Sequence, residues 1–140
     1  MRVRVFSQHG QGRVDVPALA QSAARFFGTA LEASAPDGVR MALASGAFVR
    51  CSVTARAATE ADLDDARAAE QRGRAGGMAA LAERCPWVWE LDGAGASDDA
   101  LWTLAAIAAS VALGPVLPED GATLVGVRGA RERAEQAARR

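Results

Sequence analysis

The chain has 140 residues, of which half are hydrophobic, and its formal net charge at pH 7 is −1. This length favours one domain with a core of its own. The slightly acidic balance argues against a nucleic-acid partner, because phosphate binding needs a marked basic excess. All 16 basic residues are arginine, and lysine, asparagine and tyrosine are absent, a bias that a GC-rich bacterial genome favours.

Cysteine spacing and apolar runs bear on the compartment. Cys51 and Cys85 lack CxxC spacing, and two cysteines do not make the dense disulfide framework of small secreted proteins. The first residues, MRVRVFSQ, contain no apolar signal segment. The longest uncharged run, 101–117, is broken by Gly114 and Pro115 and is shorter than the roughly 20 residues that span a bilayer. We therefore expect a cytoplasmic protein without a membrane partner.

The first elements are a strand and a helix. Arginine and valine alternate over residues 2–6, which is the period of a strand with one solvated face. Asp15 can cap the helix that follows, with Pro17 in its first turn. Apolar residues at helical spacing predict that this helix continues to about Ala33.

Glycine and proline separate the remaining elements, and no linker divides the chain. The expected elements are strands over 39–44, 48–56, 87–91 and 123–127, and helices over 60–72, 78–84, 98–113 and 129–140. The strands over 39–44 and 48–56 are expected to form a β-hairpin. The helix over 98–113 is apolar almost all round, so it must be covered by its own domain or by a partner subunit.

This order of elements predicts an α+β fold over the single domain 1–140. We expect a two-layer sandwich with the βαββαβ order of ferredoxin-like folds, followed by an αβα extension whose last helix frays. Many unrelated proteins share such an order, so it implies no activity.

The period of the strands places several arginines on one face of the expected sheet: Arg2, Arg4, Arg40, Arg50 and Arg56. Without an equal number of acids, these guanidiniums can bind carboxylates or phosphates of a partner in bidentate fashion. The alternative is an ordinary solvated face, with Glu90 paired to one of the arginines.

Two glycine-rich segments are alternative sites for an anion or for catalysis. Their residues are His9, Gly10, Gly12 and Arg13 in one segment and Arg72 and Arg74 in the other. A histidine beside free backbone amides can act as a general base, and arginines near a helix N-terminus can hold a phosphate. No GxSxG elbow accompanies the histidine, so the structural alternatives are a strand-to-helix turn and a flexible break.

Metal, cofactor and thiol chemistry are not expected. One histidine and two separated cysteines do not form a zinc set, and the acids over 62–65 suit the start of a helix. Cys51, on the apolar face of a strand, and Cys85, at a helix C-terminus, are expected to be inert thiols.

These patterns favour a small non-catalytic protein that binds another, acidic protein through the arginine-bearing face, as an adaptor, an immunity-type protein or an assembly subunit. The alternative is a small-ligand or anion-binding protein, or an enzyme, that uses the glycine-rich segments. A homo-oligomer formed through the helix over 98–113 is a further hypothesis, because Ala105, Ala108, Ala109 and Ala112 allow close contact between helices.

Overall fold

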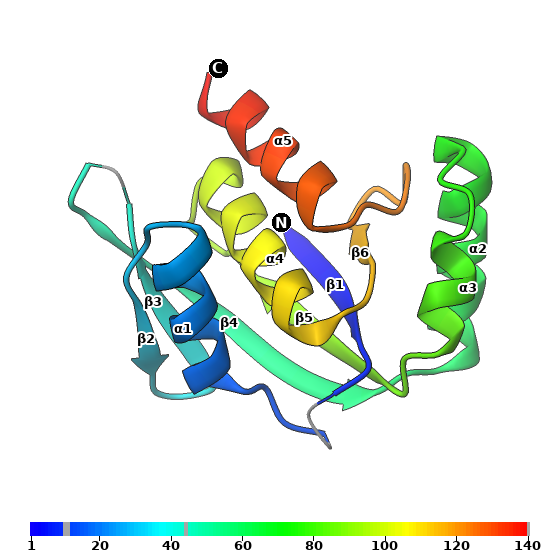
Figure 1. Ribbon diagram of the computed structural model, residues 1–140, viewed down its shortest axis with the longest axis horizontal. Coiled ribbons are helices and arrows are strands. Elements are labelled where there is room, and N and C mark those ends of the chain that lie inside the picture. Colours follow the sequence, from blue (N-terminus) through cyan, green and yellow to red (C-terminus); the bar gives the residue numbers. More distant parts are fainter. Residues whose placement is uncertain (10–11, 44, 140) are drawn as a thin grey trace.

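The computed structural model describes residues 1–9, 12–43 and 45–139 (Figure 1). Within these residues the strands are β1 (Arg2–Ser7), β2 (Leu31–Ser34), β3 (Gly38–Ala42), β4 (Phe48–Ala57), β5 (Trp87–Asp92) and β6 (Val116–Pro118). The helices are α1 (Val16–Phe26), α2 (Glu60–Gly73), α3 (Met78–Glu83), α4 (Asp98–Ala112) and α5 (Val127–Ala138). None of these helices is long and apolar enough to cross a membrane.

The strands form one antiparallel sheet in the order β2-β3-β4-β5-β1-β6. Helices α1, α4 and α5 lie over one face of it (Figure 1), so the predicted α+β sandwich is confirmed. The ferredoxin-like order is not confirmed. Strand β5 lies between β1 and β4 and is antiparallel to both, and β2 adds a strand before the expected hairpin.

The first helix is shorter than the sequence pattern predicts. Asp15 caps it as expected and accepts a hydrogen bond from the backbone N–H of Ala18 at 3.0 Å. However, α1 ends at Phe26, and Gly28 then adopts a left-handed φ of +61° that turns the chain. The next residues form the edge strand β2, in which Leu31 is buried and pairs with Met41.

The predicted strand over 123–127 is wrong. Within the described residues, only Val125 forms a bridge there, to Val116 of β6. The chain then enters α5, whose Ala130 and Ala134 are buried against the core. This helix therefore packs on the domain through Ala130 and Ala134 and extends to Ala138, and the expected end at residue 140 lies outside the described residues.

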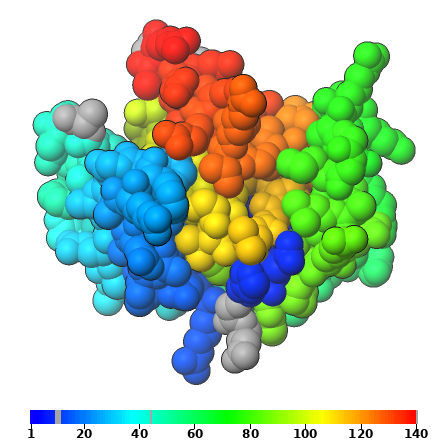
Figure 2. All heavy atoms as spheres, viewed as in Figure 1, coloured from blue at the N-terminus to red at the C-terminus, as the bar shows by residue number. Residues whose placement is uncertain are grey.

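Helix α4 is the centre of the main core. Ten of its residues are buried, because the sheet, α1 and α5 pack around it. Figure 2 shows the N-terminal and C-terminal segments lying against its sides. The alanines expected to contact another protomer, Ala105, Ala108, Ala109 and Ala112, are buried inside this chain and offer no free surface. The oligomeric state stays a prediction.

A second, smaller core lies on the opposite face of the sheet, under α2 and α3. Phe6, Val88 and Leu117 alternate along their strands with residues of the main core, so they point the other way, toward the alanines of these two helices. On the same face, Arg50 and Thr54 of β4 are exposed. The β3–β4 half of this face is therefore open.

Candidate functional site

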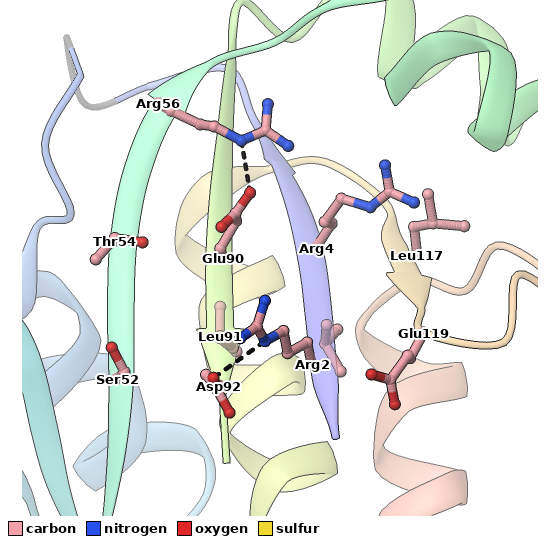
Figure 3. A pocket seen from close by; sticks show the side chains of 11 residues that line it. Arg2, Arg4, Ser52, Thr54, Arg56, Glu90, Leu91, Asp92, Leu117 and Glu119 are labelled. Atoms are coloured by element: carbon pink, nitrogen blue, oxygen red, sulfur yellow. Dashed lines mark hydrogen bonds and ion pairs between the residues drawn. The ribbon is translucent and has the colours of Figure 1, made fainter. Parts of the chain in front are cut away.

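The structure places the predicted arginines on this second face of the sheet: Arg2, Arg4, Arg40, Arg50 and Arg56. Arg2 and Arg4 lie across from acidic residues of β5, and Arg40 lies directly across from Arg50. Figure 3 shows three of the arginines around a hollow of the sheet.

The expectation that this face carries fewer acids than arginines is wrong, because four of the five arginines lie within ion-pair distance of a carboxylate. Arg2 Nε lies 3.1 Å from Asp92 Oδ2, and Arg40 Nη1 lies 2.9 Å from Glu32 Oε1. Arg4 and Arg56 pair with a carboxylate that α2 supplies. Asp92 and Asp62 lie 90 and 58 positions from Arg2 and Arg4, so strand alternation alone could not predict those two pairs. Glu32 and Asp62 lie only 8 and 6 positions from Arg40 and Arg56.

Asp62 joins α2 to the sheet. Its Oδ1 accepts hydrogen bonds from Arg4 Nη1 at 3.0 Å and from Arg56 Nη2 at 2.8 Å, and its Oδ2 accepts one from Arg56 Nη1 at 2.6 Å. The Thr59 backbone N–H also donates to Oδ2, at 2.8 Å, in a capping box. Arg56 Nε lies 2.5 Å from Glu90 Oε1, which is the pairing expected for Glu90.

The Asp62 carboxylate is only 2% exposed, and its ionisation reflects its partners. Burial alone would raise the pKa of Asp62, but the hydrogen bonds from Arg56, Thr59 and Arg4 hold this pKa well below its usual range. The same hydrogen bond to Asp62 raises the pKa of Arg56. The sequence predicts only a helix start for the acids over 62–65, although the T-x-x-D pattern over 59–62 marks a capping box.

A hollow of about 480 Å³ lies over β4, β5 and β1 and reaches β6 (Figure 3). Its charged lining is balanced, with Arg2, Arg4 and Arg56 against Glu90, Asp92 and Glu119. The side chains of Ser52 and Thr54 add hydroxyl groups. Such a lining can hydrogen-bond a polar surface, and its equal numbers of opposite charges give little net attraction for a free anion.

An exposed aromatic ring lies at the outer end of the same face. Phe48 is 53% exposed, and the Arg40 guanidinium lies 4.5 Å from the centroid of its ring. No binding role was predicted for Phe48, although it lies two residues before Arg50 in the period-two alternation of β4. That alternation is the signal that places both side chains on one face.

Residues 9, 12 and 13 of the first glycine-rich segment lie within the part of the chain that the structure describes. His9 and Arg13 are both exposed, and no hydrogen bond or ion pair joins their side chains within the described residues. Gly12 has a φ of +81° beside the ring of Trp87, a conformation that favours glycine. Gly10 lies outside the described residues. The segment follows β1 and precedes α1, and its use as an anion or catalytic site stays a prediction.

The second glycine-rich segment already holds an anionic group of its own. Glu70 Oε2 accepts a hydrogen bond from the backbone N–H of Ala79, at the start of α3, with 2.7 Å between the atoms. Arg72 Nη1 donates to the carbonyl of Gly121 at 3.1 Å, and Arg74 adopts a left-handed conformation that ends α2. A carboxylate of this chain is therefore already bonded to the N-terminus of α3, the helix that was expected to help hold an external anion, and anion binding by Arg72 and Arg74 stays a prediction.

Both cysteines have the environment expected of inert thiols. Cys51 and Cys85 are buried and unpaired. Burial raises the pKa of Cys51, and it raises the pKa of Cys85 to about 11, so both thiols are protonated at neutral pH. Across residues 1–9, 12–43 and 45–139, no cluster of three or more His, Cys, Asp or Glu side chains is placed to bind a metal ion.

Comparisons with protein-family models, with curated proteins and with solved structures find no match. The class of protein is therefore defined only by the fold and the candidate site described above. Within the described residues, the protein is an α+β sandwich with a six-stranded antiparallel sheet. Helices cover one face of this sheet, and the other face is charged and is only partly covered by helices.

Proposed function

We propose that this chain is a small non-catalytic protein that binds another protein through the open face of its sheet. The observation that carries the proposal is that this face combines five arginines, each fixed by an ion pair or a hydrogen bond, with the exposed ring of Phe48. Arginine and aromatic residues are enriched in protein interfaces and among the residues that dominate binding energy.

Fixed guanidiniums favour binding because little side-chain entropy remains to be lost. Arg2 is held by one hydrogen bond from its Nε, which leaves its two Nη groups free to donate to a partner. Immobilising a long side chain on binding opposes association by about 0.5–1.5 kcal/mol, and ion pairs made before binding reduce that term.

A buried small-molecule site is a weaker interpretation of the same hollow. Ligand pockets are mostly apolar and enclose most of their ligand. Here the lining includes Ser52, Thr54 and six charged side chains, and Thr54 is exposed. A wide polar contact with a protein surface suits this lining better. An adaptor, an immunity-type protein and an assembly subunit of the cytoplasm all remain forms of the proposal.

Photo-crosslinking tests this proposal. A benzoylphenylalanine introduced in place of Thr54, in the open face, is expected to crosslink one specific protein in cells of the source organism. The matched control is the same substitution at Gln21, which is exposed on α1 in the opposite layer. Specific crosslinking from Gln21 and none from Thr54 would refute the open face as the docking surface.

A further inference from the structure

Two arginines on the open face form a like-charged cross-strand pair. Arg40 of β3 and Arg50 of β4 are directly opposite in the register of the antiparallel hairpin. Like charges in this arrangement destabilise a sheet unless an opposite charge lies between or beside them. Arg40 has such a neighbour in Glu32 on β2, with 2.9 Å between Nη1 and Oε1.

Arg50 is held by neutral groups only. Its Nε donates to Ser34 Oγ at 3.3 Å, and its Nη2 donates to the carbonyl of Pro36. The guanidinium lies against Gly38, where a Cβ atom would come within 2.8 Å of Arg50 Nη2. Within the described residues, no carboxylate lies within ion-pair distance of Arg50. Its position is therefore fixed while its charge is not neutralised.

Phe48 gives the same place an apolar surface. It pairs with Ala42 in the hairpin register, two residues along each strand from the two arginines. Its ring is covered on one side by Arg40 and is 53% exposed overall. A fixed cation and an exposed aromatic ring thus lie next to each other on the β3–β4 hairpin.

We propose that Arg40, Arg50 and Phe48 recognise an acidic segment of the partner protein. A carboxylate of that segment binds between the two guanidiniums, and an adjacent large apolar side chain packs on the Phe48 ring. This inference rests on the proposed function and specifies the partner segment as acidic, with a large apolar side chain beside the carboxylate.

Charge complementarity favours this end of the face over the hollow. In the hollow, three arginines meet three carboxylates, so an incoming acidic group is also repelled there. On the hairpin, Glu32 pairs with Arg40 and no carboxylate pairs with Arg50 within the described residues. The uncompensated positive charge on this face is therefore located at Arg50.

Titration of the 15N-labelled protein with a short peptide tests the site directly. The probe is a blocked peptide of sequence Glu-Asp-Leu-Phe-Glu, and its control is Lys-Arg-Leu-Phe-Lys. Saturable chemical-shift changes of the β3 and β4 amides are expected with the acidic peptide and not with the basic control peptide. Arg50→Gln and Phe48→Ala are each expected to weaken its affinity by about tenfold, because each removes one of the two contacts.

The matched control variant is Arg128→Gln, which removes a 94% exposed guanidinium on α5 and is expected to bind like the wild type. The inference would be overturned if Arg50→Gln bound the acidic peptide as tightly as the wild type, or if no saturable chemical-shift change occurred. It would also be overturned if the chemical-shift changes fell on other elements, or if inorganic phosphate produced equal changes. Since Arg50 and Phe48 are exposed, both variants are expected to fold, and far-ultraviolet circular dichroism verifies this. A protein that crosslinks from Thr54 but binds Arg50→Gln normally would refute this site and leave the proposed function standing.

Discussion

Replacing Gly114 by alanine is expected to destabilise the protein by about 3 kcal/mol or more, in the range of severe overpacking. A Cβ atom at this position would lie 1.9 Å from the backbone oxygen of Phe6 and 2.9 Å from Cys85 Sγ. The backbone cannot yield locally, because the Phe6 N–H donates to the carbonyl of Pro115 at 3.0 Å and joins β1 to the segment between α4 and β6. Urea denaturation of the variant and wild type measures the difference.

The matched control is Gly76→Ala, since no atom lies within 4 Å of a Cβ built on Gly76. Its effect on the free energy of unfolding is expected to stay within about 0.5 kcal/mol, as for other surface positions. A similar, small effect of both substitutions would contradict the close packing of Gly114 against β1.

The second large effect is expected for Asp62→Asn, which removes the charge that Arg4 and Arg56 share. Removing one partner of a buried ion pair lowers the free energy of unfolding by about 3–5 kcal/mol, and the lower end applies here because both guanidiniums are partly exposed. Asp65→Asn is the matched control. Asp65 also pairs with Arg4, at 2.9 Å, but is 55% exposed, so its loss is expected to be below about 1 kcal/mol.

The same variant has a distinct pH signature. Because the pKa of Asp62 is lower in the folded protein than the value of about 3.9 in an unfolded chain, its charge stabilises the fold above about pH 4. That contribution is lost as the pH falls through the folded-state pKa. The stability gap between wild type and Asp62→Asn is therefore expected to be constant near neutral pH and to narrow in acid. A gap that widens below pH 4 would contradict this assignment.

Much of the fold follows from local patterns, and the misses have local causes. Period-two alternation predicted β1 and the β3–β4 hairpin, and the long apolar run predicted α4, because these signals survive in any tertiary context. Strand β2 was missed since apolar residues before it continue the helical spacing of α1. The left-handed turn at Gly28 ends that helix, and a single glycine in a helical pattern does not predict such a turn.

For the candidate site, alternation was enough to place five arginines on one face and not enough to find their partners. Asp62 lies 58 positions from Arg4 and reaches it only because α2 folds back over the sheet. The absence of a carboxylate beside Arg50 could not be predicted either. It depends on the lack of a side chain at Gly38 and on the neutral acceptors Ser34 and Pro36. These are tertiary facts that one sequence does not contain.

The affinity of the crosslinked partner for purified wild type and Arg50→Glu, measured at low and high salt, tests the docking face most directly. Arg50 is suited to charge reversal because it lies outside the Asp62 cluster that holds α2 on the sheet. The reversal is expected to weaken binding by about tenfold or more at low salt, and the difference is expected to shrink as salt screens the charges. A glutamate at this position would repel an acidic partner docked anywhere on the face, which the neutral Arg50→Gln change would not do. Equal affinity of the two proteins at low salt would therefore contradict the arginine-bearing face as the binding surface for an acidic partner.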